Sequence, residues 1–278
     1  MSRVVRRAAV VLVAIGLLVT GTAYVVRSLI NTKLPAAQTA SCDVINSPYT
    51  LSTEQAANAA TISAVAISRK LPSRAVAVAL ATALQESKLI NVEYGDRDSV
   101  GLFQQRPSQG WGSQGQILDP RYSAGKFFDA LVKVRGWETM PLTAAAQAVQ
   151  QSAHPTAYRQ WEDQAGTLTK AFTGAEPALL SCSFPEPTVA ASPAKVMQLL
   201  ALELPHTKLS ATPQMGELKP GEAPWATAGW LVAKADRLGI EAVALDGRRW
   251  TRSDGWRVDA GAATDRVRFE VAKIPPAA

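Results

Sequence analysis

Cysteine and histidine are scarce in this chain, which has only two of each among its 278 residues. The cysteines, Cys42 and Cys182, and the histidines, His154 and His206, do not have the spacing of a structural zinc site. Neither histidine has partners at a spacing that supports a catalytic triad. We therefore expect no metal and no cofactor.

Long basic tracts are also lacking, although Lys and Arg outnumber Asp and Glu by 29 to 23. A net charge of +6 suits an anionic polymer or a membrane as partner, or reflects only a basic solvated surface. Without a basic tract or a zinc finger spacing, nucleic acid is not an expected partner. Apolar residues make up 47% of the chain, which excludes a disordered protein.

One long uncharged run is present near the N-terminus, from Ala8 to Val26, between an arginine cluster and Arg27. As a helix it would be about 28 Å long, close to the roughly 30 Å of a bilayer core. The basic residues before it favour a cytoplasmic N-terminus. We therefore predict a single-pass cell membrane protein, held by its N-terminal helix, with the bulk of the chain extracytoplasmic. A cleaved signal peptide ending near Gly21-Thr22-Ala23 is the alternative, and it also implies export.

The pattern of apolar residues divides the rest of the chain. We predict a cytoplasmic tip and transmembrane anchor over 1–27, a linker over 28–41, an all-helical domain over 42–182, a second linker over 183–192 and a small C-terminal α/β domain over 193–278. Within the helical domain, caps and apolar spacing predict helices over 52–70, 73–88 and 120–136, and others starting near Thr143 and Pro155. In the last domain, residues 240–245 and 266–271 have strand patterns.

The two cysteines fit an exported chain, because disulfides persist outside the cytoplasm. If Cys42 and Cys182 are paired, they close a loop of about 140 residues, which the chain-entropy model values at roughly 5 kcal/mol. Two unpaired buried thiols are the alternative.

Glu86 is the best candidate for a catalytic acid. It lies shortly before the expected end of an apolar helix, about 100° around the axis from the middle of the apolar face. A carboxyl group there can be half-buried, and desolvation favours the protonated form that serves as a general acid. Taken alone, a solvated charge near Lys88 is the simpler interpretation.

Two blocks around Glu86 resemble the signature of lysozyme-like lytic transglycosylases, in which a Glu-Ser pair ends a helix and a Gly-Leu-Met-Gln block follows. The blocks here are Ala83-Leu84-Gln85-Glu86-Ser87 and Gly101-Leu102-Phe103-Gln104-Gln105. The wider segment, including Tyr94 to Asp98 and Gln105 to Gly112, is similar to an actinobacterial branch found in exported cell-wall proteins. The resemblance covers about Ser52 to Trp161.

The resemblance implies that Glu86 protonates the oxygen leaving N-acetylmuramic acid at its bond to N-acetylglucosamine. As a carboxylate it would then accept the proton of the muramyl 6-hydroxyl as that oxygen attacks C1, which gives a 1,6-anhydro sugar. Inverting hydrolysis would instead need a second carboxylate about 6.5–9.5 Å away. Asp96 and Asp98 are the candidates, unless they are turn residues or charge partners of Arg97 and Arg106.

Several residues of this segment are expected to contact the glycan strands: Ser87, Gln104, Gln105, Tyr94, Trp111 and Gln150. Amides can bond to sugar substituents, and aromatic faces can pack on sugar rings. The family's third block, Ala-Tyr-Asn-Ala-Gly, is altered here, since Gln150 falls at the asparagine and no tyrosine precedes it. Tyr158 could take the place of that tyrosine in space.

The C-terminal domain faintly resembles domains of actinobacterial wall proteins that are similar to zinc peptidases. Arg266 and Arg268 fall where such peptidases have a His-x-His ligand pair, so the resemblance implies the fold without the metal. We therefore predict a chain that cleaves peptidoglycan glycan strands, as a lytic transglycosylase or muramidase. The alternatives are a non-catalytic peptidoglycan-binding protein and a scaffold subunit of a cell-wall complex.

Overall fold

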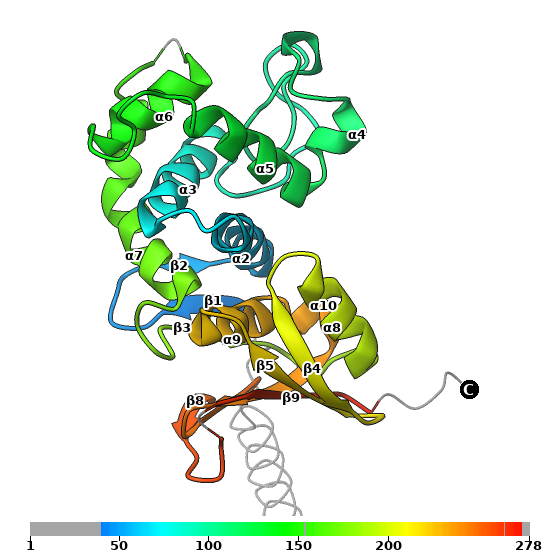
Figure 1. Ribbon diagram of the computed structural model, residues 1–278. Helices are drawn as coiled ribbons and strands as arrows, with labels where there is room; N and C mark the ends of the chain where they lie inside the picture. Colours follow the sequence, from blue (N-terminus) through cyan, green and yellow to red (C-terminus); the bar gives the residue numbers. More distant parts are fainter. Residues whose placement is uncertain (1–39, 153, 264, 274–278) are drawn as a thin grey trace, which may run out of the picture. The chain divides into compact units, whose positions relative to one another are not determined.

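The computed structural model describes residues 40–152, 154–263 and 265–273 (Figure 1). The transmembrane anchor predicted over 1–27, and most of the linker after it, lie outside these residues. Within the described part, no helix is both long enough and apolar enough to cross a membrane. The described residues all belong to one compact unit. For clarity, residues 41–183 are called the helical region and residues 184–273 the C-terminal region.

The helical region is built around α2, which spans Thr53–Ser68. Its predicted capping box is confirmed, because the side chain of Ser52 accepts from the backbone of Gln55 and the Gln55 side chain accepts from Ser52 in return. Every residue from Ala56 to Ala66 is buried, as expected of a helix that is apolar on all sides. The elements around it are α3 (Ser73–Ser87), α4 (Gln114–Ile117), α5 (Pro120–Leu131), α6 (Leu142–Gln150) and α7 (Glu162–Thr173), with 3-10 turns η1 (Pro107–Gln109) and η2 (Ala157–Trp161).

The prediction of an all-helical domain is wrong, because this region also contains an antiparallel sheet of order β2-β1-β3. Its strands are β1 (Ser41–Val44), β2 (Thr50–Leu51) and β3 (Leu180–Ser183). Cys42 lies opposite Cys182 in the ladder, and the two form a disulfide. Strands of two to four residues are too short to show an alternating pattern, which is why sequence periodicity did not reveal them.

The predicted C-terminal α/β fold is also wrong, because every strand pair of the six-stranded sheet is antiparallel, in the order β4-β5-β9-β6-β7-β8. The described chain is therefore mixed, with nine α-helices and two antiparallel sheets. Two strands had been predicted, β6 (Ile240–Leu245) and β9 (Val267–Val271), and four had not: β4 (His206–Ala211), β5 (Met215–Pro220), β7 (Arg248–Thr251) and β8 (Gly255–Val258). The helices are α8 (Pro193–Ala201), α9 (Pro224–Ala233) and α10 (Ala235–Leu238).

The two regions share a core, because α9 packs against α2, α7 and β3 of the helical region and against β6 and β9 of its own sheet (Figure 1). All residues of α9 from Trp225 to Ala233 are buried. Just after α9, the Nζ of Lys234 donates to Thr61 Oγ1 of α2 at 2.8 Å and to Glu203 Oε1 at 2.9 Å. The hydrogen bond from Lys234 to Thr61 thus links the regions beside their apolar contact, whereas the ion pair with Glu203 lies within the C-terminal region.

Candidate functional site

The C-terminal end of α3 is fixed by polar side chains of α2. Lys88 and Leu89 both adopt left-handed backbone conformations, with φ of 56° and 61°, and turn the chain away from the helix. Gln55 Nε2 donates to the carbonyl of Lys88, and the buried amide of Asn58 donates to that of Leu89, both at 2.8 Å. These bonds satisfy carbonyls that a helix end leaves free. They also set the position of Glu86 in the last turn.

Glu86 is half-buried, and its carboxylate contacts a buried phenol. The Tyr158 hydroxyl donates to Glu86 Oε1 at 2.8 Å, and the Tyr158 side chain is fully buried in η2. Burial raises the pKa of Tyr158, and the neighbouring charge of Glu86 raises it further. The phenol therefore stays protonated throughout the physiological range and keeps donating. Among the described residues, no group donates to the second oxygen of Glu86.

The Gly-Leu-Phe-Gln-Gln block forms a tight loop beside this helix end. Val100 and Gln105 pair as an antiparallel bridge, and Gly101 between them has a φ of +80°, which favours glycine. The buried Phe103 ring stacks on Phe127 of α5, with 4.7 Å between ring centroids. The loop is thus anchored in the core by its aromatic residue.

Two of the predicted substrate-binding residues hold this loop in place. Ser87 Oγ donates to the carbonyl of Leu102, and Gln150 Nε2 donates to that of Phe103, both at 2.8 Å. The end of α3, the loop and the end of α6 are therefore joined directly around Glu86. Tyr158 from η2 adds the direct contact with the Glu86 carboxylate.

The two glutamines of the block have different surroundings. Gln104 is half-buried, has a φ of 47°, and its Nε2 donates to the carbonyls of Gly101 and Tyr94 at 3.2 and 3.4 Å. Gln105 is only 2% exposed, and its Nε2 donates to the carbonyl of Ser123 at 3.1 Å. Burial therefore keeps Gln105 from direct contact with a large substrate, whereas Gln104 remains at the surface.

The two candidate second carboxylates are not equivalent. Asp98 accepts from Arg106 Nε at 2.7 Å and from the backbone and hydroxyl of Ser108 at 2.8 and 3.0 Å. The hydrogen bond from Arg106, followed by those from Ser108, holds the pKa of Asp98 well below its usual range. Asp96 is 89% exposed and lies 3.8 Å from Arg97. The structure thus makes both aspartates partners of arginines, and it records no contact of either with Glu86.

The two predicted aromatic contacts lie in different places. Tyr94 is 78% exposed. Trp111 is half-buried and lines a pocket of about 580 Å³ with Gln109, Lys126, Val149 and Gln151, among others. Because Gln151 directly follows Gln150, this pocket begins next to the α6 residue that holds the loop beside Glu86.

The neighbours of Glu86 in α3 are held by side chains of η2 that the sequence did not point to. Gln85 Oε1 accepts from Trp161 Nε1 at 2.8 Å and from Gln160 Nε2 at 3.0 Å. Lys88 Nζ lies over the Trp161 ring, 4.2 Å from its centroid, and partial burial lowers the pKa of Lys88 against the opposing effect of Glu86. The position of Trp161 in the helix expected near Pro155 gives no sign of the α3 side chains that it meets.

No group of three or more His, Cys, Asp or Glu side chains that could hold a metal occurs in the described residues. At the positions compared with a zinc ligand pair, Arg266 and Arg268 lie 3.6 and 3.2 Å from Glu217 Oε1 on β5. Comparison with models of known protein families and with curated proteins gives no match for this chain. Its function has to be inferred from the geometry around Glu86.

Proposed function

We propose that this chain cleaves the glycan strands of peptidoglycan, with Glu86 as the general acid and base. The observation that carries the proposal is the hydrogen bond from the buried Tyr158 hydroxyl to Glu86 Oε1. It holds the carboxyl group of a half-buried glutamate in one orientation beside a loop whose sequence resembles that of lytic transglycosylases.

In this proposal, Tyr158 is a positioning residue and Glu86 transfers the proton. The protonated Glu86 gives its proton to the glycosidic oxygen that leaves N-acetylmuramic acid, and the bond from C1 to that oxygen breaks. The muramyl 6-hydroxyl oxygen then forms the new bond to C1, while the Glu86 carboxylate accepts the hydroxyl proton. Glu86 is thereby returned to its starting state.

The surroundings of the aspartates favour the anhydro product over inverting hydrolysis. Inverting hydrolysis needs a carboxylate that is free to activate water. Asp98 already accepts three hydrogen bonds from Arg106 and Ser108, and Asp96 is almost fully exposed beside Arg97. The intramolecular route needs neither aspartate, since the nucleophile belongs to the substrate.

The pocket lined by Trp111 supports a binding surface that continues from the loop toward α6. An indole face can pack on a sugar ring, and the half-buried Gln104 of the loop has an amide oxygen that can accept from a sugar hydroxyl. Peptidoglycan lies outside the cytoplasm, so this function agrees with the proposed location of the chain on the outer side of the cell membrane. That location depends on residues 1–27 and stays a prediction.

The test is to incubate purified sacculi with the full chain and identify the released muropeptides by mass spectrometry. We expect 1,6-anhydromuropeptides. Glu86→Gln removes the proton donor but keeps the shape, so it should lower the rate at least about 100-fold, the usual contribution of general acid catalysis. Glu93→Gln, at an exposed glutamate of the neighbouring loop, is the matched control and should keep full activity.

Other outcomes identify the alternatives. Release of reducing muropeptides that depends on Glu86 would indicate hydrolysis. Binding to sacculi without soluble products, by a chain with an intact circular dichroism spectrum, would favour a non-catalytic peptidoglycan-binding protein. A folded chain with no affinity for sacculi would favour a scaffold subunit and overturn the proposal.

A further inference from the structure

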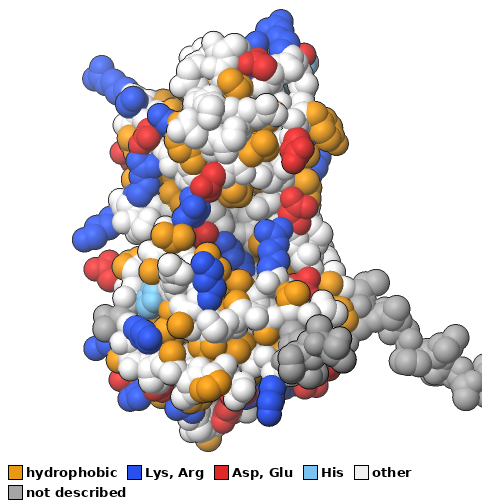
Figure 2. Space-filling model, turned by 90° about the vertical axis from the view of Figure 1, so that its right-hand side faces the viewer, with side chains coloured by type: hydrophobic (Ala, Val, Ile, Leu, Met, Phe, Trp, Pro, Cys, Tyr) orange, Lys and Arg blue, Asp and Glu red, His pale blue; other side chains and the backbone are white. Residues whose placement is uncertain are grey.

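A pocket on the side of α5, α8 and α10 lies away from Glu86 and has no part in the proposed chemistry. Figure 2 shows Lys and Arg side chains gathered around a hollow on this side of the molecule. The pocket has a volume of about 270 Å³ and is lined by residues of both regions: Arg121, Leu199, Leu202, Glu203, Trp230, Lys234, Arg237 and Leu238.

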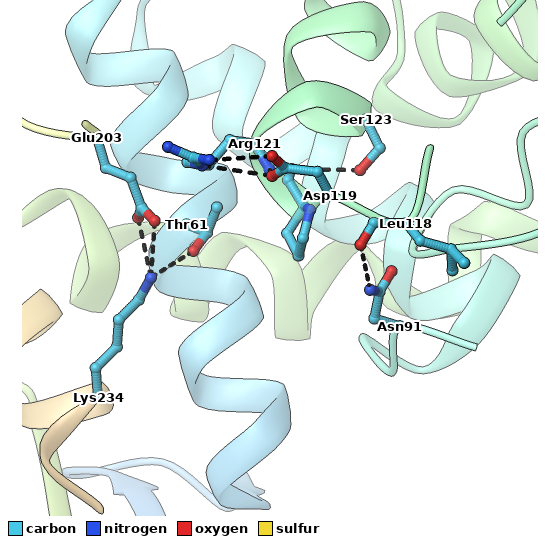
Figure 3. A network of polar contacts seen from close by, with 9 residues as sticks. Thr61, Asn91, Leu118, Asp119, Arg121, Ser123, Glu203 and Lys234 are labelled. Carbon is cyan, nitrogen blue, oxygen red and sulfur yellow. Dashed lines mark hydrogen bonds and ion pairs between the residues drawn. The ribbon is translucent and has the colours of Figure 1, made fainter. Parts of the chain in front are cut away.

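The ion pair of Lys234 and Glu203 in this pocket has its hydrogen bonds filled by protein groups. Lys234 Nζ donates to both oxygens of Glu203 and to Thr61 Oγ1 (Figure 3). Trp230 Nε1 also donates to Glu203 Oε2, at 2.6 Å. The side chains of Lys234 and Glu203 are only 15% and 8% exposed. This pair is therefore neutral as a unit and has no Lys234 proton left for a ligand.

Two arginines line this pocket. Arg121 of α5 is paired with Asp119, which accepts from Arg121 Nε at 3.4 Å and from Nη2 at 3.0 Å, so Nη1 is the guanidinium nitrogen left without a partner among the described residues (Figure 3). Arg237 of α10 is exposed and forms no ion pair with any described residue. Both arginines lie close enough to Lys234 for their charges to lower its pKa, although burial is the larger cause. An anion between the arginines would relieve this repulsion.

The remaining wall is aliphatic. Leu199, Leu202 and Leu238 line the pocket, and Leu202 is 59% exposed. A ligand that covers these leucines while neutralising the arginines needs an apolar group next to a negative one. The volume suits a single aliphatic residue with its carboxylate and is too small for a long acyl chain.

We propose that this pocket binds the free carboxyl terminus of a peptide whose last residue is aliphatic. The carboxylate is held by Arg121 and Arg237, and the side chain lies on the leucines. Guanidinium groups match carboxylates in geometry and donate charge-assisted hydrogen bonds. Because the lining comes from α5 as well as α8, α9 and α10, the bound peptide also bridges the two regions. This binding does not depend on glycan cleavage.

The test is isothermal titration calorimetry of the full chain with N-acetyl-Ala-Leu and with its C-terminal amide. The free acid should bind at least about 10-fold more tightly than the amide, equivalent to ~1.4 kcal/mol. Arg237→Gln should remove this preference without unfolding the chain, since Arg237 is exposed and makes no ion pair. Arg248→Gln, at an exposed arginine of β7, is the matched control and should keep the preference.

Two results would overturn the proposal. One is equal binding of the acid and the amide, or no binding of either at millimolar concentration. The other is a preference for octanoate over the peptide acid, which would identify a lipid-like acid as the ligand. Neither result bears on Glu86, and a failure of glycan cleavage would leave the acid-to-amide comparison unaffected.

Discussion

Tyr158 lies 72 positions after Glu86 in the sequence, yet its hydroxyl is 2.8 Å from the Glu86 carboxylate. A buried phenol has few rotamers available, so it fixes the oxygen that it contacts more firmly than water could. The hydrogen bond to a charged group also stabilises the fold, by about 1.5–3 kcal/mol in typical cases. Tyr158 therefore affects both rate and stability.

We expect Tyr158→Phe to lower kcat about 10-fold or more with little change in KM, because the carboxyl group loses its orientation and the binding surface remains. The free energy of unfolding should fall by about 1.5–3 kcal/mol at neutral pH. Steady-state rates on purified glycan strands and urea unfolding measure the two effects. Tyr94→Phe, at a residue that is 78% exposed, is the control and should not change stability.

The difference in the free energy of unfolding between wild type and Tyr158→Phe should become smaller at alkaline pH. The pKa of Tyr158 is raised in the folded chain, above the ~10 expected when unfolded. The folded state therefore keeps the Tyr158 proton to higher pH than the unfolded state does. The contribution of Tyr158 to the free energy of unfolding is fully present below about pH 10 and is lost as pH rises through the folded pKa. The gap between wild type and Tyr158→Phe should be constant from pH 7 to 9 and narrow above about pH 10. A gap that widens in alkali would contradict this assignment.

At this scale, the sequence identified Glu86 as a candidate through its helix position and the neighbouring motif. It suggested Tyr158 only as a replacement for a missing tyrosine. The contacts of Gln85 with Trp161 and of Asn58 with Leu89 could not be predicted, because they join segments whose pairing depends on how the helices pack.

Among the elements, the loop from Val100 to Gln105 determines what surrounds Glu86. Gly101 has a φ of +80°, and a Cβ there would lie 3.0 Å from the carbonyl oxygen of Ile117. Gly110 has nearly the same φ, +81°, but no atom within 4 Å of the position of its Cβ. An alanine at either position would have a strained backbone, but only an alanine at position 101 would also meet a neighbouring atom.

Gly101→Ala should destabilise the chain by about 3 kcal/mol, since it adds a steric clash to the cost of a left-handed alanine. Gly110→Ala should cost only about 1–2 kcal/mol, the left-handed backbone term alone. Urea unfolding of both variants gives the comparison. Equal destabilisation by Gly101→Ala and Gly110→Ala would mean that the Ile117 backbone moves aside at no cost in free energy.

The starts of α2, α3 and α5 were predicted because caps and apolar periodicity are local signals. The prediction was wrong where α5 ends at Leu131 instead of near 136, and where the 3-10 turn η2 delays the start of α7 from near Pro155 to Glu162. The Asp119 cap and the proline after it do begin α5, and Ser52 does cap α2. Thr143 is an exception, since it lies inside α6 and its hydroxyl donates to Glu162 Oε1 at 2.8 Å instead of capping the helix. The strands β1 to β3 were missed because the ladder that defines them forms between the two ends of the helical region.

On the scale of the whole molecule, the Lys234 and Glu203 pair lies where the helical and C-terminal regions meet. Both side chains are buried, and Thr61 of α2 accepts the remaining bond from Lys234. Removing one partner of a buried pair leaves an uncompensated charge, whereas removing both leaves none. Both charges belong to the C-terminal region, so the pair stabilises that side of the boundary, and only the bond to Thr61 crosses it.

We expect Lys234→Met alone to lower the free energy of unfolding by about 3–5 kcal/mol. The double variant Glu203→Gln/Lys234→Met should lose less than the sum of the single changes, with a coupling energy of about 1–3 kcal/mol. A double-mutant cycle by urea unfolding measures this energy. Strict additivity would show that the two charges act independently.

The position of α2 has a consequence for any shortened form of this protein. Eleven consecutive residues of that helix, from Ala56 to Ala66, are buried, and α9 covers part of their surface. A truncation after Ser183 would remove α9 and expose apolar residues of α2 to water. Asn58, which holds the turn after Glu86, belongs to this same helix. Proteolytic loss of the C-terminal region should therefore abolish activity at Glu86 without removing any residue that contacts it. The helical region expressed alone should not fold stably.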